Sequence, residues 1–397
     1  MNTKVLVTNG WLRSSYSTLR NLSKVGIPVH VSDTGRFGMS QFSKYKKGSD
    51  TYTSHYQNEE LFVRDLKEIS YREKINLIFP SHNETEVLAK YRKTLGENLC
   101  RIIPKYEHCT LFNNKSAAYD YAESQGIPVP KRYHYESPND LIHLLEEVGP
   151  VVIKLLTGNS SKGVYFAQDP IRASEIVEEL IDRYELTTSR YPQVEQRVEG
   201  EGWGCSVLYW EGKSIADFTH RRLREKINTG GTSTLRQQRD HAGIREAAHK
   251  IFSGIGWHGL AMCEFKVCPK TGRFWFIEVN PRMWGSIPLA VDAGVEFPYL
   301  AFLCANENPE VARRYFERSS LRINHKSRWM LGELSLVAKY LFRLKFIGAF
   351  RILYEKVDST DDFHWDDPLA FVGQVLRYCL NSLGGLSFNP EEKGMLK

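Results

Sequence analysis

The sequence predicts an α/β protein with three parts: a parallel sheet flanked by helices, a middle built from strand hairpins, and a helical C-terminal part. Residues 4–31 predict the first part, because two short apolar runs flank a helix that Gly26 ends, as in a β-α-β unit. Residues 203–220 and 262–279 predict the second part, because each holds two strand-like runs around a Gly-containing turn. Helical patterns after residue 305 predict the third part.

The first part continues with a helix near 59–72, a strand at 77–79 and a helix near 84–94, which predicts one small α/β domain over residues 1–105. Residues 81–84 follow the strand at 77–79, where ligands of open sheets bind, although a simple helix cap is the more common reason for such residues. A dinucleotide-binding domain with Asp33 on a ribose is an alternative. It is disfavoured because only Gly10 of the Gly-x-Gly-x-x-Gly fingerprint is present.

Composition indicates an ordinary globular protein. The chain has 397 residues, 42% hydrophobic and 25% charged, which suits two or three domains. A net charge of +6 fits an anionic small-molecule substrate and does not indicate a nucleic-acid partner. Seven cysteines without a Cys-x-x-Cys pair predict neither a zinc site nor a disulfide scaffold. No apolar run reaches the ~18 residues of a membrane span, and we expect a cytoplasmic protein.

Two lysines in the middle part stand in unusual places. Lys115 falls in the first turn of a helix over 115–125, where the helix dipole disfavours a cation, so a nearby anion would explain it as well as simple solvation would. Lys154 lies inside the apolar strand 151–155, and a buried lysine needs a partner. The small polar loop 157–163 that follows has the composition of loops whose backbone N–H groups cover phosphates. It is not a Walker P-loop, because a strand follows, and a plain hairpin loop is the alternative.

Three arginines, Arg221, Arg222 and Arg224, end a strand beside the Gly- and Thr-rich segment 229–234. Such a cluster fits either a shaped anion pocket or a solvated basic patch. The sequence leaves both interpretations open.

Three oxygen ligands are predicted on a hairpin formed by strands at 262–267 and 274–279 around a Pro- and Gly-containing turn. With a period of two, residues 276, 278 and 280 share one face of the second strand, so Glu278 and Asn280 point the same way. If Glu264 pairs opposite them, two carboxylates and an amide oxygen converge, which suits Mg2+. Arg282 follows just after the strand and would place a planar cation beside a phosphoryl group. A surface hairpin with scattered charges is the alternative.

The order of these features resembles the ATP-grasp superfamily. The resemblance rests on two lysines (Lys115 and Lys154), a Glu-rich strand at 193–198, Arg-Arg-Leu-Arg at 221–224, and Glu264 followed by Glu-x-Asn-Pro-Arg at 278–282. The sequence looks most like the branch of carbamoyl-phosphate synthetase large subunits and biotin carboxylase, with D-alanine–D-alanine ligase more distant. The resemblance implies an N-terminal pre-ATP-grasp domain (1–105), an ATP-grasp domain (106–305) with a lid at about 130–200, and a mostly helical extension (306–397).

The resemblance also implies ATP and Mg2+ (or Mn2+) as cofactors and a role for each matching residue. The ATP ligands would be Lys115, Lys154, Ser160, Ser161, Gly163, Glu195, Gln196, Val198 and Glu201. Glu201 is offset from the family's ribose ligand, so the ribose contact stays open. The metal ligands would be Glu264, Glu278 and Asn280, and the catalytic residues Arg282 and Arg222. The acid substrate would contact Arg221, Arg222, Arg224, Gly231 and Arg282.

The expected reaction is that of a carboxylate–amine ligase, which phosphorylates a small carboxylic acid to an acyl-phosphate, couples it to an amine, and releases ADP and phosphate. One alternative is phosphorylation of bicarbonate or another small acceptor, as in carbamoyl-phosphate synthetase. Another alternative is an ATP-binding protein without catalysis. The identities of the acid and the amine cannot be read from the sequence.

Residues 329–354 form a long stretch of Leu, Phe, Ile and Tyr with Lys339, Arg343, Lys345 and Arg351 interleaved. An amphipathic helix of this kind docks on its own parent domain, on a second subunit of a homodimer, or on a membrane surface. The sequence favours docking on the parent domain or on a second subunit.

Overall fold

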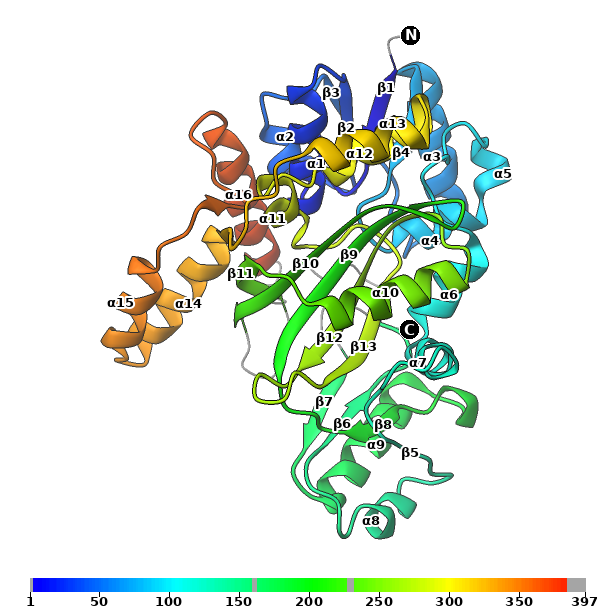
Figure 1. The fold of residues 1–397 in the computed structure, drawn as a ribbon, viewed down its shortest axis with the longest axis vertical. Helices are drawn as coiled ribbons and strands as arrows, with labels where there is room; N and C mark the ends of the chain where they lie inside the picture. Colours follow the sequence, from blue (N-terminus) through cyan, green and yellow to red (C-terminus); the bar gives the residue numbers. More distant parts are fainter. Residues whose placement is uncertain (1–2, 159–162, 227–231, 384–397) are drawn as a thin grey trace.

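The N-terminal part is a four-stranded parallel sheet with helices on its faces, as predicted (Figure 1). The computed structural model describes residues 3–158, 163–226 and 232–383. The strands lie in the order β3-β2-β1-β4, and each of β1 and β2 is buried on both faces, as parallel strands usually are. Their bounds are β1 (Lys4–Val7), β2 (Val29–Asp33), β3 (Gly48–Thr51) and β4 (Ile75–Phe79). The helices up to the next part are α1 (Arg13–Lys24), α2 (Met39–Phe42), α3 (Glu59–Arg72), α4 (Glu84–Lys90), α5 (Arg92–Leu95) and α6 (Tyr106–Asn113).

Asp33, the residue of the dinucleotide alternative, is used inside the protein. Its carboxylate is fully buried and accepts hydrogen bonds from the backbone N–H of Trp11 (2.8 Å) and from Gln41 Nε2 (3.1 Å). The guanidinium of Arg377 lies 3.9 Å away. These contacts leave the carboxylate no access to a ribose.

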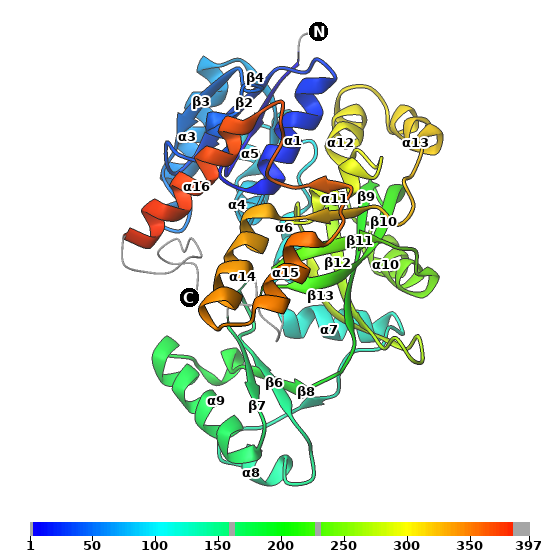
Figure 2. The ribbon, with the colours of Figure 1, turned by 90° about the vertical axis from the view of Figure 1, so that its left-hand side faces the viewer.

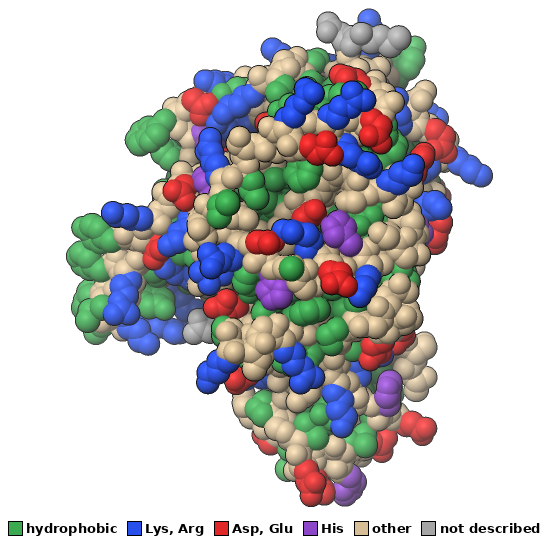
Figure 3. Space-filling model, in the orientation of Figure 1, with side chains coloured by type: hydrophobic (Ala, Val, Ile, Leu, Met, Phe, Trp, Pro, Cys, Tyr) green, Lys and Arg blue, Asp and Glu red, His purple; other side chains and the backbone are tan. Residues whose placement is uncertain are grey.

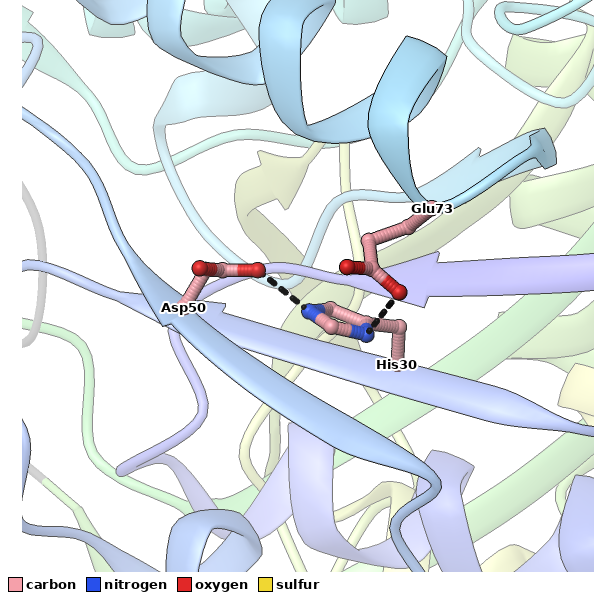
Figure 4. A group of neighbouring side chains, drawn as sticks. All are labelled: His30, Asp50 and Glu73. Atoms are coloured by element: carbon pink, nitrogen blue, oxygen red, sulfur yellow. Dashed lines mark hydrogen bonds and ion pairs between the residues drawn. The ribbon is translucent and has the colours of Figure 1, made fainter.

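A polar cluster connects β2, β3 and the end of α3. The His30 ring lies between the carboxylates of Asp50 and Glu73 (Figure 4). Burial lowers the pKa of His30, and the two carboxylates oppose this shift. Each carboxylate also has a cation, because Lys4 Nζ lies 2.9 Å from Glu73 and Arg72 pairs with Asp50. The three side chains could surround a metal ion, but their pairing with cations identifies them as a structural ion-pair network.

A small antiparallel sheet forms a separate layer at the bottom of Figures 1 and 2. Its order is β5-β8-β6-β7, and helices α8 and α9 cover one face with a core of their own. The bounds are β5 (Arg132–Tyr133), α8 (Asp140–Leu144), β6 (Val151–Lys154), β7 (Val164–Ala167), α9 (Pro170–Tyr184) and β8 (Gln193–Gln196), with a 3-10 turn at Thr188–Arg190.

The third sheet has seven strands in the order β13-β12-β9-β10-β11-β14-β15. Along β9 the side chains alternate between two cores: Val207 and Tyr209 face helices α7 and α10, and Leu208 faces the N-terminal part. The bounds are α7 (Lys115–Ser124), β9 (Glu201–Trp210), β10 (Lys213–Glu225), β11 (Ser233–Gln238), α10 (Ala242–Gly254), β12 (Gly259–Val267), β13 (Phe274–Asn280), β14 (Lys326–Arg328) and β15 (Ser359–Thr360).

The C-terminal part is mainly helical, as predicted, but it also supplies β14 and the edge strand β15 of this sheet. Its acidic segment holds the parts together, since the buried Asp361 pairs with both Arg13 of α1 and Arg236 of β11. Asp362 caps the start of α14 by accepting from Met330 N (2.8 Å). The helices are α11 (Ile287–Asp292), α12 (Phe297–Asn306), α13 (Pro309–Arg318), α14 (Met330–Phe342), α15 (Phe346–Tyr354) and α16 (Pro368–Leu383).

The stretch 329–354 is a helical hairpin and not one continuous helix. Leu344 between α14 and α15 has a φ of 55°, which is incompatible with a continuing right-handed helix. Among the described residues, no helix has the length and the apolar character that crossing a bilayer would require.

Candidate functional site

The predicted carboxylates do meet across a hairpin. In the antiparallel pair β12–β13, Glu264 is directly opposite Glu278, and Met262 is opposite Asn280. The amide of Asn280 donates to Glu264 Oε1 at 3.2 Å. Within the described part of the chain, no hydrogen bond or ion pair holds the Glu278 carboxylate, and burial together with the charge of Glu264 raises its pKa. The arrangement therefore places two carboxylates directly opposite each other, so that the charge of one acts on the other.

The prediction that residue 276 shares their face is wrong, because β13 contains a bulge. Phe276 is opposite Phe265 while Glu278 is opposite Glu264, so Ile277 is the extra residue. Phe276 and Val279 both pack in the core under α7 and α10. The bulge thus turns Glu278 and Asn280 away from that core, onto the face that Met262 shares with the N-terminal part.

Arg222 reaches these carboxylates from two strands away. Strand β9 lies between β10 and β12, yet Arg222 Nη2 lies 2.5 Å from Glu264 Oε2. Gly202 of β9 makes room, because a Cβ atom there would lie 2.9 Å from Arg222 Cδ. Burial works to lower the pKa of Arg222, but the carboxylates of Glu264 and Glu225 outweigh it and raise the pKa.

The other two arginines of the cluster point elsewhere. Arg221 donates to Gln237 Oε1 (2.9 Å from Nη2) and lies 3.8 Å from the half-exposed Glu201. Arg224 pairs with the buried Glu333 of α14. The three arginines therefore do not form one pocket, and only Arg222 faces the carboxylates.

Lys115 and Lys154 are both buried, one on α7 and one at the end of β6. Lys115 Nζ donates to the carbonyl of Gly158 at 3.0 Å. Burial lowers the pKa of Lys115, and the charge of Glu278 opposes that shift. Lys154 Nζ lies 2.6 Å from Glu195 Oε1 and donates to Tyr119 Oη at 3.0 Å. Lys154 thus has the partner that its apolar strand required.

The remaining residues predicted to contact the nucleotide differ in how deeply they are buried. The carboxylate of Glu195 is buried against Lys154, whereas Gln196 is exposed and Val198 half-buried at the end of the small sheet. Gly163 has a φ of 77°, and a Cβ atom there would lie 2.8 Å from Leu155 Cδ1, so its backbone shapes the loop. Three predicted residues lie outside the described residues: Ser160, Ser161 and Gly231.

Arg282, two residues after Asn280, connects the end of β13 to the N-terminal part. Its Nε donates to Asn83 Oδ1 at 3.0 Å and its Nη1 to the carbonyl of Met283 at 3.0 Å. Burial lowers the pKa of Arg282, and the charge of Glu278 opposes this. Of the residues at the end of β4, Asn83 therefore belongs to the site. The neighbouring Glu84 is structural, because its carboxylate accepts from Thr8 Oγ1 (2.6 Å) and Ser81 N (2.7 Å).

Two further residues border the site without a sequence pattern that would single them out. Tyr119, one turn after Lys115 on α7, holds Lys154. His220 is buried in the middle of β10, and its Nε2 lies 3.2 Å from Ser286 Oγ. Burial, reinforced by the charges of Arg222 and Arg236, lowers the pKa of His220 to about 3, so the ring is neutral.

Comparison with known proteins supports the predicted relationship. Residues 194–328 match the family described as "ATP-grasp in the biosynthetic pathway with Ter operon". A pyruvate carboxylase of Bacillus subtilis is 25% identical over 241 residues, which are 56% of this chain and 20% of that protein. A carbamoyl phosphate synthase large chain of Pyrococcus furiosus is 27% identical over 188 residues, 44% of this chain and 17% of that protein. The chain thus spans a fifth or less of these curated relatives.

Solved structures show the same fold. The biotin carboxylase domain dimer of Hydrogenobacter thermophilus 2-oxoglutarate carboxylase, described in complex with MgADP, ADP and bicarbonate, has a TM-score of 0.63. It is 16% identical and covers 82% of this chain and 73% of that one. An L-amino acid ligase of Bacillus licheniformis has a TM-score of 0.62 at 14% identity, with 82% and 78% covered. The ATP-grasp fold with an N-terminal parallel α/β part is confirmed.

Proposed function

We propose that this chain, which carries an ATP-grasp domain, is an ATP-dependent carboxylate–amine ligase that works through an acyl-phosphate. The observation that carries the proposal is the meeting of Glu264, Glu278 and Asn280 with Arg222 and Arg282. The domain boundaries after residues 105 and 305, with the lid at about 130–200, are part of the same proposal, as is a homodimer.

The oxygen donors fit a divalent cation. Glu264, Glu278 and Asn280 would hold Mg2+ (or Mn2+), since the set contains only carboxylate and amide oxygens and Glu278 has no competing ion pair among the described residues. A bound Mg2+ neutralises phosphate charge and polarises the phosphoryl oxygens. Lys115 and Lys154 would bind the ATP phosphates, with the 157–163 loop (Ser160, Ser161, Gly163) closing over them.

The chemistry then needs cations around a phosphoryl group in transfer. A carboxylate oxygen of the acid attacks the γ-phosphorus of ATP, the bond to the β-phosphate oxygen breaks, and ADP leaves. Arg282 and Arg222 would hold the two anions together in this step. The amine nitrogen then attacks the acyl carbon, loses a proton, and displaces phosphate.

The adenine would lie against the segment of Glu195, Gln196 and Val198 that links the small sheet to β9. Since the Glu195 carboxylate is paired with Lys154, we assign the adenine contact to the backbone of this segment. Glu201 remains the proposed residue near the ribose. Arg221 and Arg224 would contact the acid only after moving, because they face other partners here. Gly231 remains a proposed contact of the acid.

A screen of acids and amines tests the proposal directly. We expect phosphate release from ATP and Mg2+ to require both an acid and an amine, with an amide product in equal amount, measured by coupled phosphate assay and mass spectrometry. Release with bicarbonate alone would instead support phosphorylation of bicarbonate, the anion named with one structural neighbour. ATP binding without turnover for every acid tested would support a non-catalytic protein.

The position of Arg222 is tested by Gly202→Ala. The added Cβ would lie 2.9 Å from Arg222 Cδ and push the guanidinium away from Glu264. We expect kcat/KM for the acid to fall about tenfold to a hundredfold, since small misplacements of a positioning cation have effects of this size. Gly149→Ala is the matched control, because a Cβ there meets no atom within 4 Å. An unchanged kcat/KM in Gly202→Ala would contradict a role for Arg222 in binding the acid.

A further inference from the structure

The α14–α15 hairpin projects from the body of the molecule, on the left of Figure 1. Its two helices pack on each other through Leu336, Val337, Ala349 and Ile352, with Tyr340 beside them. The hairpin is anchored at its base, where Glu333 pairs with Arg224 of β10, Asp362 accepts from Met330 N, and Glu355 pairs with Lys326. The sequence favours two arrangements, and one of them, docking of the whole stretch on its own parent domain, is wrong for the far end of the hairpin. This far end, residues 341–354, is called the tip below.

The outer surface of the hairpin is apolar and open to solvent. Phe342 is 89% exposed, Leu344 74% and Ile347 75%. Further large apolar side chains of the same tip are exposed: Leu341, Phe346, Phe350, Leu353 and Tyr354. Figure 3 shows this left-hand projection with hydrophobic side chains lying among lysines and arginines. A contiguous exposed set of this kind marks an interaction surface.

The charges around the tip have one sign. Between residues 334 and 354 there are four cations, Lys339, Arg343, Lys345 and Arg351, and no acid. None of the four side chains forms an ion pair within the part of the chain that the structure describes. The flanking acids are already neutralised, since Glu333 pairs with Arg224 and Glu355 lies 2.9 Å from Lys326 Nζ. The tip therefore presents apolar and cationic groups together.

We propose that the α14–α15 tip binds the surface of an anionic lipid bilayer. Apolar side chains enter the boundary between headgroups and acyl chains, while the long cationic side chains reach the lipid phosphates. A second copy of the chain meeting tip to tip is disfavoured, because it would bring four unpaired cations against four others. The tip is also a convex projection, which suits a deformable lipid interface better than a preformed protein groove.

A second exposed apolar strip, on α16, supports a membrane-facing side of the molecule that includes the tip. Leu369, Val372, Leu376 and Leu380 are exposed along α16. Figure 2 shows α14, α15 and α16 on the same side of the molecule. The ion pair between Glu333 and Arg224 would hold β10, and with it Arg222, at a fixed position relative to the bilayer.

Vesicle co-sedimentation of the full chain tests the proposal. We expect binding to phosphatidylcholine vesicles that contain phosphatidylglycerol, weak binding to phosphatidylcholine alone, and loss of binding as salt rises, because screening weakens surface charge attraction. The variant Phe342→Ser/Phe346→Ser/Ile347→Ser should lower the partition coefficient about tenfold or more. Arg343→Gln/Lys345→Gln should remove most of the preference for anionic vesicles. Both variants should keep wild-type nucleotide binding and thermal unfolding, since these side chains lie far out on the hairpin.

Matched controls carry equal changes elsewhere. Tyr71→Ser/Ile171→Ser/Ile323→Ser removes three side chains that are 89%, 61% and 74% exposed, and Lys67→Gln/Lys93→Gln removes two exposed cations. Both should bind vesicles as the wild type does. Absence of binding to anionic vesicles at low salt, or an equal loss in the controls, would overturn the proposal. A dimer detected by light scattering that the tip variant dissociates, without any vesicle binding, would assign the tip to a second copy of the chain instead.

Discussion

Replacing Glu278 with alanine is expected to abolish ATP turnover, lowering kcat by about a thousandfold or more, since a lost metal ligand removes charge stabilisation at the transferring phosphoryl group. Glu278 is the carboxylate that no described side chain pairs with, and it lies directly opposite Glu264. Removing it leaves one carboxylate that Arg222 already neutralises. Steady-state ADP release with saturating Mg2+ measures the effect.

The raised pKa of Glu278 adds a second readout. Because burial and Glu264 favour the protonated form, Mg2+ competes with a proton for this carboxylate, and its affinity should rise as pH increases through that raised pKa. Glu278→Gln should bind Mg2+ weakly at every pH, as isothermal titration of the metal would show. Glu246→Ala is the control, since Glu246 is an exposed glutamate on α10 whose partner is Lys250. Full turnover by Glu278→Ala would remove the basis of the proposed site.

The hairpin that carries the predicted metal ligands could be predicted because its determinants are local. The turn at 269–272 and the alternation of residues on either side predict the hairpin and its register next to the turn, where Phe265 is opposite Phe276. That register alone would place Ile277 opposite Glu264, so the bulge at Ile277, which was not foreseen, is what brings Glu278 opposite Glu264. A bulge leaves no clear mark in a strand of Phe, Trp and Ile, because the extra residue resembles its neighbours.

Contacts between distant segments could not be predicted in the same way. The sequence of the cluster at 221–224 does not indicate that Arg222 passes over Gly202 to reach Glu264, or that Arg224 pairs with Glu333 of α14. The strands β14 and β15 are three and two residues long, and each is defined by its neighbour, since β14 pairs with β11 and β15 pairs with β14. Asn83 became a site residue only through Arg282, which is far away in the sequence. In each case the determinant is the packing of two segments, which one sequence does not encode locally.

The sequence did require a partner for Lys154, and the partner found predicts a large effect on stability. Lys154→Met should destabilise the small sheet by about 3–5 kcal/mol, because it leaves Glu195 as a buried carboxylate without its cation. The small sheet contains no tryptophan, so tryptophan fluorescence would not report its opening. Hydrogen exchange of the β6 and β8 amides does report the opening of the sheet. Since about 1.4 kcal/mol of opening free energy corresponds to a tenfold change in protection, the protection of these amides should fall a few hundredfold or more.

A double variant separates structure from binding. In Lys154→Met/Glu195→Leu, both charges are replaced by apolar groups, and most of the protection should return, because such replacements of a buried ion pair are often neutral. ATP affinity should stay low in this variant if Lys154 also binds phosphate, since apolar packing restores the fold but no cation. Lys131→Met is the control, because the Lys131 side chain is exposed and lies over the Tyr133 ring, with no ion pair among the described residues, and its carbonyl accepts from the N–H of Gln196. Recovery of both protection and ATP affinity in the double variant would show that Lys154 is a structural residue alone.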